Sequence, residues 1–244
     1  MKIIAFIPAR LESLRLPKKP LIKIDGMPMV MHVYKRTSLC KLLDDVIVCA
    51  DDNKIIDVIK KINGKALLTS KKFKNGTERI SSVSKKINYD LAIDVQCDEV
   101  FVDPDQLKKL INFHKKNLQF DIVVPHSITN SFNNKNIVKL AHNSKKEVLY
   151  MSRSDVPFFF RNKIRYLKKH LDFISFKKKA LDKFLKLKPG LLEKTEGVEL
   201  LRAIENDLKV GTFNINSNNF SINTPSDLAK AKKIMKKCLL RKYY

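Results

Sequence analysis

Four cationic side chains, Arg10, Arg15, Lys18 and Lys19, follow the apolar run at residues 3–7. Arginine presents a forked pair of donors and lysine a compact charge, so such a loop can neutralise the charge that builds up on a departing pyrophosphate. In open α/β sheets, ligands bind just past the carboxyl ends of the strands, which is where this loop lies if residues 3–7 form a strand. The residue types therefore indicate a triphosphate site, although spacing alone supports a solvated basic loop equally well.

The loop belongs to the first of several motifs, Ile7-Pro8-Ala9-Arg10-Leu11-Glu12-Ser13-Leu14-Arg15-Leu16-Pro17-Lys18-Lys19-Pro20-Leu21. The later motifs are Asn75-Gly76-Thr77-Glu78-Arg79, Val95-Gln96-Cys97-Asp98-Glu99, Tyr150-Met151-Ser152-Arg153 and Asn223-Thr224-Pro225-Ser226-Asp227-Leu228. Together they resemble the motifs of the 3-deoxy-manno-octulosonate cytidylyltransferases, the enzymes that make CMP-Kdo, and the first is similar to the family's IPAR-x-x-S-x-RLP-x-KPL signature. The resemblance extends over nearly the whole chain.

The resemblance implies a nucleotide site and a site for an acidic sugar. It places the nucleotide against Pro8, Ala9, Arg10, Arg15, Lys19, Asn75, Gly76, Thr77 and Arg79, with Arg10 and Lys19 on the phosphates of CTP. It places the acid against Gln96, Arg153, His170, Glu193 and Glu196. Judged without the resemblance, Glu193 and Glu196 would be a solvated helix face and His170 a structural histidine.

The implied reaction is transfer of CMP from CTP to the anomeric hydroxyl of a 3-deoxy-manno-octulosonate-like acid, with release of pyrophosphate. In this scheme Arg10, Lys19 and Asp98 are the catalytic residues, and Asp98 and Asn223 hold Mg²⁺ at the reacting phosphate. Phosphoryl transfer of this kind depends on positioning and charge neutralisation more than on covalent chemistry. Mg²⁺ bridges phosphate oxygens and is typically held by one or two protein carboxylates.

Several positions depart from the family pattern near the implied site. Asn223 stands where the family has a metal-binding aspartate, Cys97 and Lys18 stand in place of glycines, and Val100 in place of a proline. An amide oxygen brings no negative charge, so we expect weaker metal binding than in the family. The departures leave two alternatives open: activation of a different acid, such as an amino-modified ulosonate, or a nucleotide-binding paralogue with weak activity.

The elements that must position these residues follow an alternating pattern. Continuous apolar runs predict buried strands at residues 3–7, 45–50, 91–95 and 121–125, and amphipathic periodicity predicts helices at residues 53–62 and from residue 104. Such alternation is typical of an open, mostly parallel (mixed) α/β sheet, and the resemblance specifies a Rossmann-like nucleotidyltransferase fold.

After residue 136 the pattern changes. Alternating runs at residues 137–141 and 147–151 predict an antiparallel hairpin, followed by helices at residues 176–184 and 193–204, a strand at 208–215 and a last helix capped by Thr224. We expect one domain over residues 1–244. Family precedent implies a homodimer formed through an antiparallel excursion at about residues 137–176.

Composition limits the partners and the cellular location that we expect. The formal net charge is +24, but the lysines are scattered through every segment, which favours their lying on solvated faces of the fold. The alternative is nucleic-acid binding through the basic surface, which would be strongly salt-dependent. No run approaches the roughly 18 apolar residues of a membrane span. The cysteines, Cys40, Cys49, Cys97 and Cys238, lack CxxC spacing and indicate reduced thiols. We therefore expect a cytoplasmic protein with neither a nucleic-acid nor a membrane partner.

Overall fold

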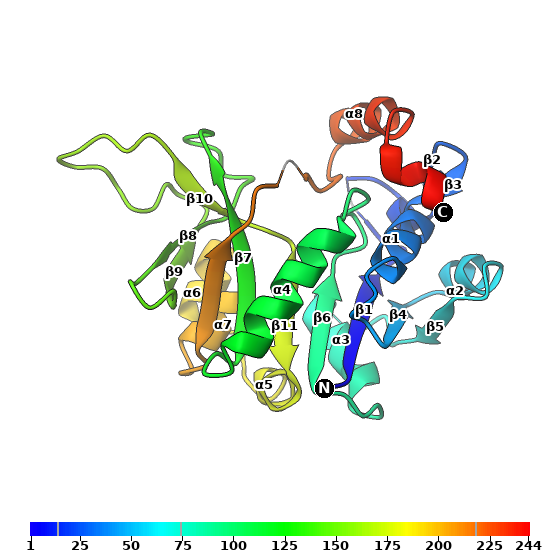
Figure 1. Cartoon of the computed structure of the whole chain (residues 1–244), viewed down its shortest axis with the longest axis horizontal. Helices are drawn as coiled ribbons and strands as arrows, with labels where there is room; N and C mark the ends of the chain where they lie inside the picture. Colours follow the sequence, from blue (N-terminus) through cyan, green and yellow to red (C-terminus); the bar gives the residue numbers. More distant parts are fainter. Residues whose placement is uncertain (14, 74, 218) are drawn as a thin grey trace. The chain divides into compact units, whose positions relative to one another are not determined.

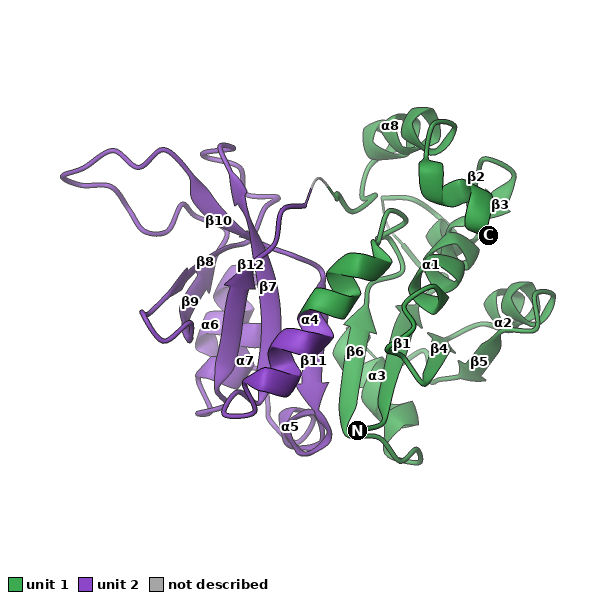
Figure 2. Cartoon of the chain, viewed as in Figure 1, with its two compact units in different colours: residues 1–109, 219–244 green, residues 110–218 purple. Residues whose placement is uncertain are grey.

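The computed structural model describes residues 1–13, 15–73, 75–217 and 219–244. The chain forms two compact units (Figure 2): unit 1 consists of residues 1–109 and 219–244, and unit 2 of residues 110–218. The single domain expected over residues 1–244 stays a prediction. The long helix α4 (Pro104–Lys116) contains residues of both units.

Unit 1 is built on a parallel sheet with the strand order β5-β4-β1-β6 (Figure 1). These strands are β1 (Ile3–Ala9), β4 (Asp45–Ala50), β5 (Lys65–Leu68) and β6 (Leu91–Val95). Every residue of β1 and β6 is buried, as expected for apolar runs covered on both faces of a parallel sheet. The strands predicted at residues 3–7, 45–50 and 91–95 are confirmed, and the first of them extends to Ala9.

The helices of unit 1 begin at clear capping residues. Asp52 caps α2 (Asn53–Lys60) by accepting from the backbone N–H of Lys54, and Thr224 caps α8 (Pro225–Met235) in a reciprocal capping box with Asp227. Both helices were predicted. The sequence patterns did not predict α1 (Met29–Ser38) or α3 (Gly76–Ser84), which both pack against β1 and β4. Short elements complete the unit: β2 (Lys23–Ile24), β3 (Met27–Pro28), η1 (Lys19–Leu21) and η2 (Leu239–Tyr243).

Unit 2 is organised around β7 (Ile122–Thr129). This strand pairs in parallel with β12 (Val210–Asn214) and antiparallel with β10 (Leu167–His170) and β11 (Phe173–Lys177). The predicted hairpin is present as β8 (Lys139–His142) and β9 (Val148–Ser152), and β10 joins it to β7. The predicted α/β fold with a mixed sheet and an antiparallel excursion is confirmed.

The helices of unit 2 differ from prediction at their boundaries. The helix expected at residues 176–184 is α5 (Lys178–Phe184), because the residues before it form β11. The single helix expected at residues 193–204 is two, α6 (Leu191–Glu196) and α7 (Leu200–Ile204), because Gly197 adopts a left-handed conformation with φ of 63° and ends α6. In the described part of the chain, no helix has both the length and the apolar character needed to cross a membrane.

Candidate active site

A pocket of about 430 Å³ opens in unit 1 where β1 and β6 end. The chain passes from β1 to β4 and β5 on one side and then to β6 on the other, so the strand order switches between β1 and β6. Open α/β sheets bind ligands at this switch point, outside the carboxyl ends of the strands. The pocket is lined by the predicted residues Pro8, Arg10, Arg15, Lys19, Gln96, Asp98 and Asn223, together with Ser13, Pro20 and Cys97.

Polar contacts inside this pocket join the first motif to the third and the last. Lys19 Nζ forms an ion pair with Asp98 Oδ2 at 2.6 Å and donates to Asn223 Oδ1 at 3.2 Å. Arg15 Nη2 donates to the same amide oxygen at 3.1 Å. Three segments that are far apart in the chain therefore meet in this pocket; Arg15 and Asn223, for example, are 208 residues apart.

Backbone contacts hold these segments in place. The backbone N–H of Ile222 donates to the carbonyl of Asp98 at 3.2 Å, and the backbone N–H of Asn223 donates to Asp227 Oδ2 at 3.0 Å.

In the cationic loop, Lys18 has a left-handed backbone with φ of 55° immediately before η1. That conformation favours glycine, which gives a physical reason for the glycine of the family motif at this position.

The N-terminus of α3 lies close to the pocket wall. A Cβ atom on Gly76 would lie 3.0 Å from Pro8 Cγ and 3.1 Å from Gln96 Nε2, so a side chain here would press on both pocket residues. Asn75 caps the helix by accepting from the backbone N–H of Glu78 at 2.8 Å. Asn75, Gly76, Thr77 and Ala9 do not line the pocket themselves, and Thr77 and Ala9 are buried.

Arg79, which the resemblance places against the nucleotide, lies away from the pocket lining. Its side chain is not on the pocket wall but inside unit 1, only 2% exposed, where it donates to Asp51 Oδ2, Thr69 Oγ1 and the carbonyl of Ser70. Burial lowers the pKa of Arg79, and the negative charge of Asp51 opposes that shift. The predicted contact of Arg79 with the nucleotide stays a prediction.

Gln96 has a buried partner that the sequence did not single out. Its Nε2 donates to both carboxylate oxygens of Asp94, at 2.9 and 3.0 Å, and Asp94 is 1% exposed. Since a carboxylate only accepts, Asp94 fixes the amide with Nε2 turned toward it and Oε1 left as an acceptor. The signal in the sequence was a single charge inside the apolar run Leu91-Ala92-Ile93-Asp94-Val95.

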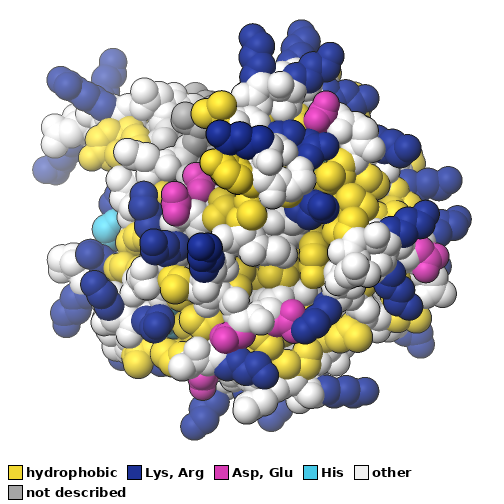
Figure 3. Space-filling model, turned by 45° about the vertical axis from the view of Figure 1, so that its right-hand side comes forward, with side chains coloured by type: hydrophobic (Ala, Val, Ile, Leu, Met, Phe, Trp, Pro, Cys, Tyr) yellow, Lys and Arg dark blue, Asp and Glu magenta, His cyan; other side chains and the backbone are white. Residues whose placement is uncertain are grey.

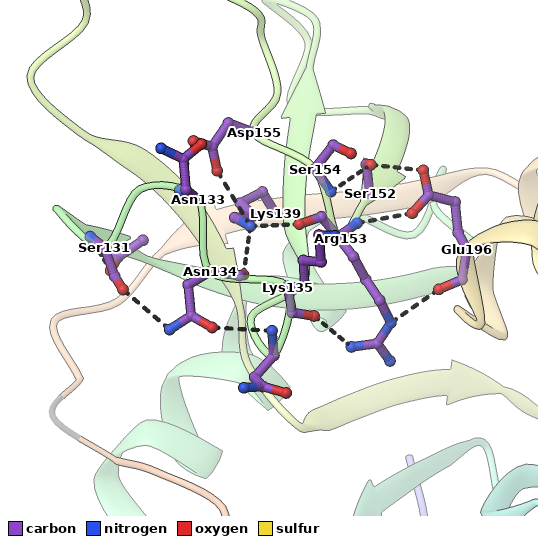
Figure 4. A network of polar contacts seen from close by, with 12 residues as sticks. Ser131, Asn133, Asn134, Lys135, Lys139, Ser152, Arg153, Ser154, Asp155 and Glu196 are labelled. Carbon is purple, nitrogen blue, oxygen red and sulfur yellow. Dashed lines mark hydrogen bonds and ion pairs between the residues drawn. The ribbon is translucent and has the colours of Figure 1, made fainter.

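The remaining residues predicted for the acidic sugar lie in unit 2. Arg153 and Glu196 form one network (Figure 4), in which the Glu196 carboxylate accepts from Ser152 Oγ at 2.6 Å and from the backbone N–H of Arg153 at 2.9 Å. The Arg153 guanidinium donates to the carbonyls of Glu196, Lys135 and Gly197. Burial raises the pKa of Glu196, but the hydrogen bonds outweigh it and leave that pKa below its ordinary value.

Glu193 and His170 have other partners. Glu193 forms a bidentate pair with the buried guanidinium of Arg202, at 2.5 and 2.6 Å, so its carboxylate serves packing between α6 and α7. His170 Nδ1 lies 3.3 Å from Asp172 Oδ1. The structure thus groups two of the four unit 2 residues, Arg153 and Glu196, and places Glu193 in an internal ion pair.

The oxygen donors in the pocket fit a magnesium ion that arrives with a nucleotide. Among the described residues, no group of three or more His, Cys, Asp and Glu side chains could hold a metal alone. Asp98 and Asn223 nevertheless converge on one ammonium group and offer a carboxylate and an amide oxygen. Mg²⁺ usually takes one or two carboxylates and completes its shell with phosphate and water, which this pair allows.

Comparison with known proteins places the chain in a family. The family model described as Cytidylyltransferase matches residues 4–210, so the chain belongs to the cytidylyltransferases and is a nucleotidyltransferase. A solved structure of CMP:2-keto-3-deoxy-manno-octonic acid synthetase complexed with CTP superposes with a TM-score of 0.92 at 30% identity, covering 97% of this chain and 99% of that one. The predicted nucleotidyltransferase fold is therefore confirmed.

Curated relatives narrow the family further. The 3-deoxy-manno-octulosonate cytidylyltransferase of Chloroherpeton thalassium is 33% identical over 98% of this chain and 100% of its own length. The 8-amino-3,8-dideoxy-manno-octulosonate cytidylyltransferase of Shewanella frigidimarina is 34% identical over 94% of this chain and 97% of its own. The family resemblance drawn from the motifs is confirmed, and identity is nearly equal for relatives named for two different acids.

Proposed function

We propose that this protein transfers CMP from CTP to the anomeric hydroxyl of a 3-deoxy-manno-octulosonate-like acid and releases pyrophosphate. The observation that carries the proposal is the pocket at the strand-order switch, which Arg10, Arg15, Lys19 and Asp98 line together. Membership of the cytidylyltransferase family and the likeness to a synthetase complexed with CTP support the choice of nucleotide.

In the proposed reaction, the anomeric oxygen forms a bond to the α-phosphorus while the bond from that phosphorus to the pyrophosphate oxygen breaks. The proton of the hydroxyl passes to solvent water, and pyrophosphate leaves with the electron pair of the broken bond. Arg10 and Lys19 bind the departing phosphates, where their charges stabilise the transition state more than the ground state. Lys19 is held for this task by its ion pair with Asp98, and Arg15 by its contact with Asn223.

Magnesium is the proposed cofactor, held by Asp98 and, through an amide oxygen, by Asn223. When bound, it would supply a Lewis acid at the phosphate oxygens. The chain provides one negative charge for it at this point, so the nucleotide phosphates must provide most of the remainder. This arrangement supports binding of the metal with CTP more than binding to the free protein.

A second candidate substrate is an amino-modified acid. The observation that favours it is the nearly equal identity to relatives named for the two acids, and Gln96 Oε1, which Asp94 leaves as an acceptor, can take an N–H donor as well as a hydroxyl. The 8-amino-3,8-dideoxy-manno-octulosonate enzyme of Shewanella frigidimarina, 34% identical, gives this candidate a precedent. The two acids are best separated by experiment.

The test is pyrophosphate release with CTP, Mg²⁺ and each acid in turn, with UTP and ATP as nucleotide controls. We expect turnover with CTP and one of the two acids, and a loss of about 10²-fold or more in Lys19→Ala. Lys23→Ala, an exposed lysine of β2, is the matched control and should leave turnover unchanged. A folded protein that binds CTP but turns over neither acid would overturn the proposed substrate class.

A cytoplasmic homodimer formed through residues 137–176 is part of the proposal. Exposed apolar side chains in this segment support it: Leu149, Phe158, Phe160 and Tyr166 are 57%, 78%, 84% and 48% exposed. We expect a dimer by light scattering and a monomer after Phe158→Ser with Phe160→Ser. Leu239→Ser, at an equally exposed position outside the segment, should leave the dimer intact. A monomeric wild-type protein at micromolar concentration would contradict this part.

A further inference from the structure

One buried carboxylate connects the first two motifs of the site, although it belongs to neither. Asp51, the residue after β4, accepts the backbone N–H of Leu11 at Oδ1 over 2.9 Å. Its other oxygen, Oδ2, lies 3.4 Å from Arg79 Nη2. The side chains of Asp51 and Arg79 are 7% and 3% exposed, so water competes little for this ion pair.

The contact with Leu11 fixes the start of the cationic loop. Leu11 directly follows Arg10, which lines the pocket. The backbone adds a second contact nearby, because the N–H of Asp51 donates to the carbonyl of Ala9 at 3.3 Å. The chain on both sides of Arg10 is therefore hydrogen-bonded to a single residue at the end of β4.

The contact with Arg79 fixes α3. Arg79 Nη1 donates to Thr69 Oγ1, and Thr69 Oγ1 donates in turn to the carbonyl of Ala50. Arg79 lies in the first turns of α3, whose first residue, Gly76, lies so near Pro8 and Gln96 that an added Cβ would be 3.0 Å and 3.1 Å from their side chains. A shift of α3 would therefore displace the side chains of Pro8 and Gln96, which line the pocket.

We propose that Asp51 is a positioning residue for the nucleotide site, which sets the cationic loop after β1 against the N-terminus of α3 through its two carboxylate oxygens. The inference rests on the proposed function for the identity of the ligand. Asp51 is absent from the pocket lining, so it acts through Arg10 and α3 and not by touching the nucleotide. Arg79 takes part in the same positioning role, because it is the residue of α3 that pairs with Asp51.

Two variants separate the two contacts. Asp51→Asn keeps an oxygen acceptor for the N–H of Leu11 but removes the charge that faces Arg79, whereas Asp51→Ala removes both. We expect the Kd for CTP to rise about tenfold or more in Asp51→Ala and two- to fivefold in Asp51→Asn, which is the range of one or two misplaced charge contacts. The KM for the acid should change less than twofold.

The matched control is Asp45→Ala, because Asp45 begins the same strand β4 and pairs with the exposed Lys65 at 2.6 Å. It should leave the Kd for CTP unchanged. Titration calorimetry with CTP is read together with thermal unfolding, so that a lower Tm with unchanged Kd in both Asp51 variants would overturn the inference. If Asp51→Ala does not fold, Asp51→Asn alone decides it.

Calorimetry also distinguishes failure of this inference from failure of the proposed function. A wild-type protein that binds no CTP would defeat the proposed nucleotide and, with it, the role given to Asp51. A wild-type protein that binds CTP as tightly as its Asp51 variants would leave the proposed function standing and remove only the positioning role.

Discussion

Asn223 is the residue whose chemistry departs most clearly from the family motif. Its amide oxygen accepts from both Arg15 and Lys19. In Asn223→Asp, a carboxylate would replace that oxygen, and metal affinity rises with the number of charged ligands. We expect the Mg²⁺ concentration for half-maximal pyrophosphate release to fall severalfold and turnover at limiting Mg²⁺ to rise.

The control for this prediction is Asn219→Asp, which adds the same charge in the same segment at a residue that bonds Gln106 and lies outside the pocket. It should leave the Mg²⁺ dependence unchanged. Equal Mg²⁺ dependence of wild type and Asn223→Asp would show that position 223 does not act through the metal.

Lys18 is predicted to store backbone strain. A non-glycine residue in the left-handed region costs about 1 kcal/mol, and Lys18 has φ of 55° and ψ of 32°. Lys18→Gly removes this cost but adds freedom to the unfolded chain, so we expect a net gain of about 0.5 kcal/mol in the free energy of unfolding by urea. Lys236→Gly, at φ of −58°, has no such strain to release and should be destabilising.

Single residues show where sequence reasoning stops. Arg10, Arg15, Lys19 and Asp98 line the pocket, as expected for charged side chains in loops that follow the carboxyl ends of buried strands. Arg79 and Glu193 are also charged, yet each forms an ion pair with a buried partner of opposite charge, Asp51 and Arg202 respectively. Those partners lie elsewhere in the chain, and only folding brings them within reach.

At the scale of elements, the N-terminus of α8 holds the last motif. Asp227 Oδ2 accepts from the backbone N–H groups of Asn223 and Thr224 and from the Thr224 hydroxyl. Asp227→Ala removes these bonds, so we expect a loss of about 1 kcal/mol in the free energy of unfolding. We also expect a higher Mg²⁺ concentration for half-maximal pyrophosphate release, because Asn223 is held less firmly. Ser226→Ala, an exposed residue of the same turn, should do neither.

Elements with strong local signals were predictable, and those defined by tertiary pairing were not. Asp52 and Thr224 marked α2 and α8 because a cap acts within its own turn. The strand β10 has the sequence Leu167-Lys168-Lys169-His170, which has no apolar alternation, and it forms because β7 and β8 flank it on both sides. Local pattern cannot report such a pairing.

At the scale of the whole molecule, the excess of basic residues does not determine the fold. On the face drawn in Figure 3, Lys and Arg side chains are spread among apolar and neutral ones. The order β5-β4-β1-β6 follows from parallel pairing between distant segments, which the sequence alone restricted only to an open α/β sheet. The position of the switch point between β1 and β6 could therefore be read only from the observed pairing, although the residues of the pocket were largely predicted.

Two buried histidines of unit 2 predict how the stability of the molecule depends on pH. His114 bonds Ser175 and the carbonyl of Phe120, and His126 bonds Thr212. Burial lowers the pKa of each imidazole to about 4; for His126, repulsion from His142 and Lys168 adds to the effect. An imidazole in the unfolded chain instead titrates near about 6.5.

Below about pH 6.5 the two imidazoles therefore bind protons in the unfolded chain but stay neutral in the folded chain. The stability that is present at neutral pH is lost as the pH falls from about 6.5 toward 4. The full loss is at most about 3.5 kcal/mol for each histidine, because each pKa unit corresponds to about 1.4 kcal/mol. We expect urea unfolding between pH 7 and 4.5 to show this slope, and His126→Asn to reduce it. His32 in unit 1, whose pKa burial also lowers, keeps part of the slope in that variant. If His126→Asn loses stability at pH 7 but retains the wild-type slope, then His126 is charged in the folded protein and the burial argument fails.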